Sequence, residues 1–167
     1  MPAGDGLDRA LATGYRYLNR RERTQAEMRA RLSRASADPA EVERALEILL
    51  EQGYLDDARF ARLFAQDKRE LDQWGSDRIR RTLLARGVDR ELVDDALEDQ
   101  PGNDSERERA VALLRRRFPS PPRDRRERER AFGMLLRRGY DSDLALEAIA
   151  AVTAHQGASD GRDIDEL

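Results

Sequence analysis

Apolar residues recur along the chain at intervals of three and four, the spacing of helices that bury one face. The pattern begins with Leu7, Leu11 and Leu18 and returns in successive segments up to Val152. No segment alternates apolar and polar residues as a half-buried strand does. We therefore predict an all-α chain with nine helices.

The segment 78–97, RIRRTLLARGVDRELVDDAL, has two related copies elsewhere in the chain. An offset of 52 places Gly87 on Gly139, and an offset of 51 places Leu83 on Leu32. A period near fifty residues is typical of tandem repeats. We expect three three-helix repeats over 7–54, 55–100 and 101–152, after a disordered N-terminus at 1–6 and before an acidic disordered tail at 153–167. Because the apolar faces are narrow, we expect neighbouring repeats to share cores in an elongated, curved array of helix-turn-helix-like units.

Local signals predict where individual helices begin. Thr24 with Glu27, and Ser105 with Glu108, have the spacing of capping boxes. Asp38 precedes Pro39 as an N-cap, and Asp124 and Asp141 are predicted to cap later helices. Prolines 119, 121 and 122 interrupt the chain, and the clearest loop is predicted at 101–104. The stripe predicted to be buried in the third helix is Val42, Ala45, Leu46, Leu49 and Leu50.

Three glycines have the surroundings of a Schellman C-cap. Each follows a leucine by four residues and precedes an apolar residue, which is expected to fold back on that leucine. The glycines are Gly53, Gly87 and Gly139, and the residues that follow them are Tyr54, Val88 and Tyr140. We interpret these glycines as structural, because none lies in a glycine-rich phosphate loop after a strand.

The composition bounds the kind of protein. The chain is 39% charged and contains no cysteine, so it has neither disulfides nor thiolate metal sites. It contains no recognisable signal segment and no apolar run of roughly 20 residues that could span a membrane. We expect a soluble, cytoplasmic monomer without membrane contact.

Few residues are suited to catalysis. The single histidine, His155, falls in the predicted tail. The acidic pair Asp56 and Asp57 is explained by capping at a helix start, where the positive end of the helix favours carboxylates. No phosphate loop, nucleophile elbow or zinc spacing is present. We predict that the protein is not an enzyme and has no metal or cofactor.

Charge is sorted by position in the repeat. The second helix of each repeat is predicted to be basic and the third acidic, and 105–140 carries a net charge of +7. Guanidinium groups suit phosphate and carboxylate partners. The candidate residues for binding a partner or DNA are Arg29, Arg31, Arg34, Arg78, Arg80, Arg81, Arg86, Arg115, Arg116, Arg117, Arg125, Arg126, Arg128, Arg137 and Arg138. The densest basic stretch also includes Arg123 and Arg130.

Two alternatives stay open for these arginines. They either contact nucleic acid or an acidic protein, or pair with the acidic helices of the same or the next repeat. A DNA-reading helix-turn-helix is disfavoured, because its second helix would present Glu91, Asp94 and Asp95 to phosphates. Trp74 could stack on a base or pack onto the helix that Ser76 begins.

One set of residues resembles the RecX family of bacterial recombination regulators. A stretch of the form G-[YF]-L-[DN]-D-x-R-[FY]-A leads into a helix of the form G-x-x-x-I-x-x-x-L-x-x-x-G. The residues that carry it are Gly53, Tyr54, Leu55, Asp56, Asp57, Arg59, Phe60, Gly75, Ile79, Leu83 and Gly87. The proline-broken, arginine-dense segment 118–130 and the acidic tail depart from the family pattern.

The resemblance implies a cytoplasmic, non-enzymatic regulator of the RecA recombinase in DNA recombination, repair and the SOS response. Such proteins lie in the groove of the RecA–DNA filament, where they inhibit its ATPase, coprotease and strand-exchange activities, and have some direct affinity for single- or double-stranded DNA. From the residues alone, the alternative is a stand-alone helical module that binds nucleic acid through arginine-rich helices.

Overall fold

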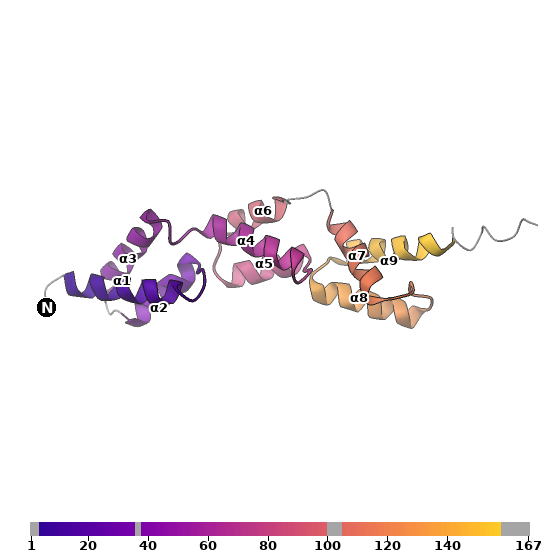
Figure 1. The fold of residues 1–167 in the computed structure, drawn as a ribbon, viewed down its shortest axis with the longest axis horizontal. Helices are drawn as coiled ribbons and strands as arrows, with labels where there is room; N and C mark the ends of the chain where they lie inside the picture. Colours follow the sequence, from indigo (N-terminus) through magenta and orange to yellow (C-terminus); the bar gives the residue numbers. More distant parts are fainter. Residues whose placement is uncertain (1–3, 36–37, 100–104, 158–167) are drawn as a thin grey trace, which may run out of the picture. The chain divides into compact units, whose positions relative to one another are not determined.

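All regular elements of the described residues are α-helices. The computed structural model describes residues 4–35, 38–99 and 105–157. The helices there are α1 (Gly4–Leu18), α2 (Gln25–Ala35), α3 (Pro39–Glu51), α4 (Asp57–Glu70), α5 (Ser76–Ala85), α6 (Arg90–Glu98), α7 (Glu106–Arg117), α8 (Arg125–Arg138) and α9 (Ser142–Gly157), as Figure 1 shows. The predicted all-α class, with nine helices in three groups of three, is confirmed over these ranges.

The chain divides into two compact units. The first consists of Met1–Ala65 and Arg81–Asp99, and the second of Gln66–Arg80 and Gln100–Leu167. Helices α4 and α5 therefore contribute residues to both units, while the other helices each belong to one.

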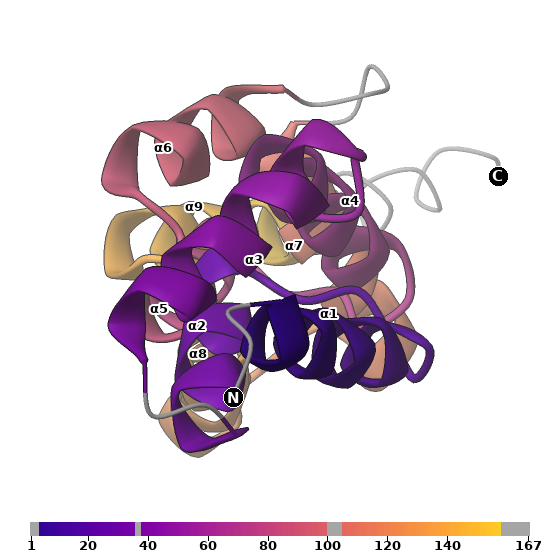
Figure 2. The same ribbon diagram turned by 90° about the vertical axis from the view of Figure 1, so that its left-hand side faces the viewer.

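In the first unit, helices α1, α2 and α3 pack against one another (Figure 2). Their buried side chains come from Ala10 of α1, Met28 and Leu32 of α2, and the stripe of α3. Of the five residues predicted to be buried in that stripe, four are buried; the prediction for Leu50 is wrong, because this residue is 37% exposed. The apolar spacing of α3 is wider than the face that its two neighbours can cover.

In the second unit, α9 packs on both α7 and α8. Leu113 and Leu114 of α7, Leu135 of α8 and Ile149 of α9 form a buried cluster together with Tyr140. The clusters of the first and third groups of helices each draw on their own group, apart from Leu55 beside the first.

The three predicted C-cap glycines are confirmed. Gly53, Gly87 and Gly139 have φ angles of +76°, +82° and +94°, a left-handed conformation that costs glycine little. In each cap the next residue donates its N–H to the leucine four residues before the glycine, at 2.9 to 3.1 Å. Val88 and Tyr140 are buried as expected.

Tyr54 is the exception among the residues that follow these glycines. Its side chain is 53% exposed, and its ring meets the edge of Tyr15 at a centroid distance of 5.6 Å. The next residue, Leu55, is buried in its place. The predicted fold-back of Tyr54 onto Leu49 is therefore wrong, because Leu55 fills that position.

The predicted helix starts are also observed. The capping boxes of Thr24 and Ser105 are formed in both directions. The side chains of Asp38, Asp124 and Asp141 each accept an N–H from the first turn that follows. Satisfying these otherwise unpaired N–H groups stabilises the helix ends.

Two predicted ends are corrected. Helix α1 begins at Gly4, inside the predicted disordered start, with Asp5 at its positive end. Helix α9 continues past Val152 to Gly157 and includes His155, because no stop signal precedes the glycine. The predicted loop at 101–104 and the tail from residue 158 lie outside the described residues.

Candidate nucleic-acid and partner interface

In the first unit, the C-terminal end of α5 meets the N-terminal end of α2. The buried Thr24 hydroxyl donates to the carbonyl of Arg86 at 2.7 Å and accepts the N–H of Glu27 at 3.1 Å. The Arg86 guanidinium donates to both oxygens of Glu27 at 2.8 and 3.2 Å. The guanidinium carbon of Arg86 lies 4.6 Å from the centroid of the Phe60 ring. We call this contact the first junction; in it, a carboxylate neutralises the arginine.

Asp57 adds a further contact to the first junction. Its carboxylate accepts the N–H of Gln25 at 2.9 Å, while neighbouring Asp56 caps α4 by accepting the N–H of Arg59. Asp57 is buried, and this burial raises the pKa of its carboxyl group, while the hydrogen bond from Gln25 acts in the opposite direction. The acidic pair thus has one capping role and one role in joining two helices.

In the second unit, the C-terminal end of α8 meets the N-terminal end of α5 in the same way. The N–H of Gly75 donates to the carbonyl of Arg138 at 2.8 Å, and that of Asp77 donates to the carbonyl of Gly139 at 3.0 Å. The carboxylate of Glu106, at the start of α7, accepts the N–H of Ser76. This contact, the second junction, repeats the first: the offset of 51 places Thr24 on Gly75 and Gln25 on Ser76.

Charge distinguishes the two junctions. The same offsets place Glu27 on Arg78 and Arg86 on Arg138, so the acid of the first junction is an arginine in the second. Arg138 donates instead to the carbonyl of Asp72, and Arg78 donates to the carbonyl of Arg137 at 3.2 Å. The second junction therefore has an arginine at both of these positions, where the first junction has an acid and an arginine.

Side chains of residues 68–78 surround the second junction. The Trp74 ring lies 4.0 Å from the guanidinium carbon of Arg78 and 4.8 Å from the ammonium of Lys68. Lys68 also bonds Asp72 at 2.6 Å, and that hydrogen bond is the main reason why the pKa of the Asp72 carboxyl group is lowered. Trp74 therefore packs beside the start of α5, as the second of its two predicted alternatives requires.

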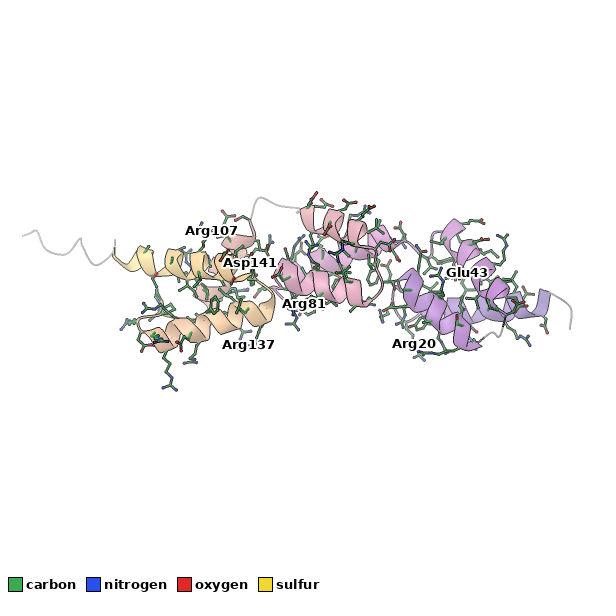
Figure 3. All side chains as sticks on the ribbon, turned by 180° about the vertical axis from the view of Figure 1, so that it is seen from behind. Arg20, Glu43, Arg81, Arg107, Arg137 and Asp141 are labelled. Carbon is green, nitrogen blue, oxygen red and sulfur yellow. The ribbon has the colours of Figure 1, made fainter. Side chains whose placement is uncertain are left out.

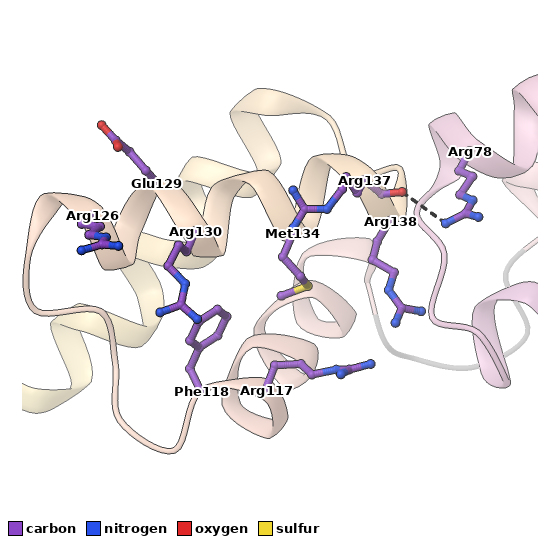
Figure 4. A pocket seen from close by; sticks show the side chains of 9 residues that line it. All are labelled: Arg78, Arg117, Phe118, Arg126, Glu129, Arg130, Met134, Arg137 and Arg138. Atoms are coloured by element: carbon purple, nitrogen blue, oxygen red, sulfur yellow. Dashed lines mark hydrogen bonds between the residues drawn. The ribbon is translucent and has the colours of Figure 1, made fainter.

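A hollow of about 680 Å³ opens beside the second junction, along α8 (Figure 4). It is lined by arginines and two apolar side chains, with a single acid. The lining residues are Arg78, Arg117, Phe118, Arg126, Glu129, Arg130, Met134, Arg137 and Arg138. We call this feature the arginine hollow.

The positive charge of the arginine hollow is poorly balanced. Among the described residues, Arg117, Arg126 and Arg130 have no ion-pair partner, and the one lining acid, Glu129, is bonded to Arg125 at 2.8 Å. Figure 4 shows Glu129 directed away from the other lining side chains. Unpaired guanidinium groups gathered in a concave surface attract anions.

The structure brings five of the predicted binding arginines together here: Arg78, Arg117, Arg126, Arg137 and Arg138. Three others are engaged in ion pairs, Arg29 with Glu43, Arg86 with Glu27 and Arg125 with Glu129. For these three arginines, pairing with acidic residues describes the observed contacts better than binding to a partner or DNA.

The remaining candidates do not line the hollow, and Arg31 lies 5.9 Å from the ring of Tyr17. They are Arg31, Arg34, Arg80, Arg81, Arg115, Arg116 and Arg128. Arg80 is half-buried and the others are exposed. Figure 3 shows charged side chains such as Arg81 and Arg137 on the helices.

Phe118 and Met134 were not predicted as site residues. Their apolar character suggested core packing, and nothing in the sequence indicates that they face arginines from α7 and α8. The sequence does contain an indication of the arginine hollow: aligning the repeats shows that Arg78 stands at the position of the acid Glu27.

The described residues offer little for catalysis or membrane insertion. In the ranges 4–35, 38–99 and 105–157, no three His, Cys, Asp or Glu side chains are grouped so as to hold a metal ion. None of the helices in those ranges combines the length and the apolar character needed to cross a membrane.

Fold and surface together define a class: an all-α protein of tandem three-helix repeats, with an arginine-lined surface. Comparison with protein families identifies it further. Family models for the first, second and third three-helix domains of RecX match residues 10–49, 56–97 and 104–149. The chain belongs to the RecX family, a family of regulatory proteins that are not enzymes, as the sequence resemblance predicted.

Individual relatives agree with this assignment. Regulatory protein RecX of Leptothrix cholodnii is 37% identical over 134 residues, which cover 80% of this chain and 83% of the relative. That of Halorhodospira halophila is 39% identical over 150 residues, covering 89% and 91%. The crystal structure of RecX from Lactobacillus salivarius has a TM-score of 0.77 at 18% identity, covers 90% of this chain and 99% of that one, and shares the fold.

Proposed function

We propose that this protein binds RecA filaments on DNA and inhibits their ATPase, coprotease and strand-exchange activities. The observation that carries the proposal is membership of the RecX family over all three repeats. The regulation of RecA is what the sequence resemblance to this family implies. The protein would act in the cytoplasm, as a monomer in contact with several filament subunits.

The distribution of charge supports binding to a repetitive, charged partner. Each of the three helices α2, α5 and α8 carries arginines, among them Arg34, Arg81 and Arg137, which are exposed. Several weak contacts along one chain raise the overall affinity, because each contact makes the next one intramolecular. A filament, which repeats the same surface, suits such a ligand.

The proposal is tested by RecA-dependent ATP hydrolysis on single-stranded DNA. The rate should fall as the protein is added, with clear inhibition at less than one molecule per RecA. An unchanged rate at every ratio would refute inhibition. A parallel co-sedimentation of the protein with assembled filaments reports binding separately from its effect on activity.

Matched variants locate the contact. Changing Arg80 and Arg81 on α5 to Ala should weaken co-sedimentation if the middle basic helix meets the filament. The control changes Arg9 and Arg44 to Ala, since both are exposed and make only helical surface pairs with Asp5 and Glu47. Equal losses in the two variants would indicate a general charge effect.

A second function is favoured by the arginine hollow: direct binding of nucleic acid as a stand-alone module. Its lining holds six arginines and one acid, and Arg117, Arg126 and Arg130 have no ion-pair partner among the described residues. This activity needs no RecA and is measured with the purified protein and DNA alone.

A further inference from the structure

We propose that Ser120 is a phosphorylation site, at which a serine kinase attaches a phosphoryl group that the neighbouring arginines then bind. The proposal goes beyond the regulation of RecA and does not depend on it. It rests on three observations: the exposed, irregular segment that holds Ser120, the arginines that share a hollow with it, and the hydrogen bond that occupies the one acid of that hollow.

Among the described serines, Ser120 is the one that a kinase could best reach. Ser33, Ser76 and Ser142 lie within helices, and the hydroxyl of Ser105 is occupied as a helix cap. Ser120 is exposed in the segment between α7 and α8, and in the described part of the chain its hydroxyl has no hydrogen-bond partner. Its oxygen is therefore available to react without the loss of a helix or a cap.

Prolines on both sides keep Ser120 out of the two helices. Pro119 precedes it, and Pro121 and Pro122 follow. A proline ring clashes with a helical conformation of the residue before it, so Ser120 is held in extended backbone. Proline also lacks the N–H that a helix interior requires. The acceptor segment is thus extended already and does not have to unfold to enter a kinase cleft.

A hollow of about 350 Å³ brings Ser120 together with two arginines. We call it the serine hollow; the lining residues are Phe118, Pro119, Ser120, Arg123, Glu127 and Arg130. It is a separate hollow from the arginine hollow, with which it shares Phe118 and Arg130.

The serine hollow is suited to hold a phosphate that is attached to Ser120. Neither Arg123 nor Arg130 has an ion-pair partner in the ranges that the structure describes. The carboxylate of Glu127 accepts the N–H of Arg123 at 2.7 Å and is thereby occupied by the backbone. A phosphoserine carries a charge of about −1.5 to −2 and three acceptor oxygens, to which guanidinium groups donate charge-assisted hydrogen bonds.

The charge around Ser120 indicates the kind of kinase. Arginines occupy residues 115–117, directly before the proline-containing segment, and Arg123 follows Ser120 by three residues. Kinases select their substrates partly by the pattern of charge beside the acceptor. We therefore expect a kinase with an acidic substrate groove.

The transfer is an ordinary phosphoryl transfer from a nucleoside triphosphate bound to that kinase. The Ser120 oxygen attacks the terminal phosphorus, and the bond from this phosphorus to the bridging oxygen breaks. The nucleoside diphosphate leaves with the electron pair of that bond, and the serine proton passes to a base of the kinase. Because the added charge exceeds the excess of one arginine in the serine hollow, phosphorylation would reverse its sign and weaken its attraction for anions.

The modification is tested on the protein purified from the bacterium that encodes it, grown with and without DNA damage. Trypsin cleaves after Arg117 and Arg123 and releases residues 118–123, in which Ser120 is the only hydroxyl side chain. Mass spectrometry should find this peptide with one added phosphoryl group, and Ser120→Ala should abolish the signal. A peptide without phosphate in both cultures would overturn the proposal.

The role of the two arginines is tested with phosphoserine inserted at position 120 during translation. Phosphorus NMR follows the second pKa of the phosphate, which is ordinarily about 6. The guanidinium groups of Arg123 and Arg130 should lower this pKa by roughly one unit or more, because they favour the dianion. A pKa that is not lowered in the otherwise unchanged chain would refute the serine hollow as the place where the phosphate is held.

Matched variants separate the two lining arginines from general charge. Changing Arg123 and Arg130 to Gln should return the pKa of the phosphate to its ordinary value. The control changes Arg125 and Arg128 to Gln, which removes the same charge from exposed positions outside the serine hollow and should leave most of the lowering in place. Equal effects of the two variants would overturn the assigned contacts. Neither RecA nor DNA is present in these measurements, so their outcome is independent of the ATPase test.

Discussion

The two junctions join the same structural positions by different means. In the first, side chains make the contact: the Thr24 hydroxyl donates to the carbonyl of Arg86, and Glu27 neutralises the guanidinium of Arg86. In the second, backbone makes it: the N–H of Gly75 donates to the carbonyl of Arg138. The absence of a side chain at residue 75 allows the two backbones to approach.

This difference separates structural and functional roles. Where the backbone holds two helix ends together, the arginines around them are not required as ion-pair partners. The second junction therefore tolerates Arg78 in the position of Glu27, and its guanidinium groups line a hollow. A repeat scaffold can in this way change the charge of one junction without changing its hydrogen-bonded frame.

The largest effect is expected from Gly75→Ala. An added Cβ would overlap the backbone of Gly139 and Tyr140, which cannot move aside as a flexible side chain could. We expect a loss of about 3 kcal/mol in the free energy of unfolding, measured with urea. The control Gly133→Ala, inside α8, should stabilise by about 0.5–1 kcal/mol, since its Cβ meets only the end of the Arg137 side chain. Similar changes in both variants would contradict a close backbone contact at the second junction.

The next effect tests the side-chain contact of the first junction. Arg86→Met removes a guanidinium that binds Glu27, and both side chains are only about one-fifth exposed, at 21% and 18%. We expect a loss of about 2 kcal/mol in the free energy of unfolding, because half-buried Glu27 loses its closest charged partner and keeps only Arg21, at 3.4 Å. Arg44→Met, which breaks an exposed pair with Glu47, should cost under about 0.5 kcal/mol. If both variants lose the same amount, the first junction depends on its ion pair no more than the surface does.

Local signals explain why most of the fold could be predicted from the sequence. The capping box of Thr24 and the left-handed glycines such as Gly139 depend on residues within one turn of each other. Errors arose where tertiary packing decides which side chain is buried. Leu55 is buried in place of its neighbour Tyr54, and α1 and α2 leave Leu50 uncovered.

The candidate site was harder to predict, because it depends on which helix ends meet. The sequence indicated basic helices, but not that Arg86 would find an acid while Arg78 and Arg138 would lie together. Phe118 and Met134 join the site only through the packing of α7 and α8. Charge along the chain therefore predicts binding surfaces less well than the repeat alignment combined with the junction geometry.

The smallest effect concerns Asp57, which supports the first junction through the N–H of Gln25. Asp57→Ala leaves this N–H without its partner and should cost about 1 kcal/mol in the free energy of unfolding. Asp57→Asn keeps an oxygen that accepts the N–H and should cost much less. Equal losses in the two variants would show that the hydrogen bond does not matter.

The pH dependence of Asp57→Asn gives a further test of the same contact. Burial raises the pKa of the Asp57 carboxyl group above its ordinary value of about 3.9. Its contribution to stability is therefore complete below that value and is lost as the pH rises through the higher folded pKa. The asparagine does not titrate, so the variant should gain stability relative to the wild type as the pH rises from about 4 through the higher folded pKa. Urea unfolding across this range measures the difference, and a wild type that gains on the variant as pH rises would mean that Asp57 is stabilised as a carboxylate.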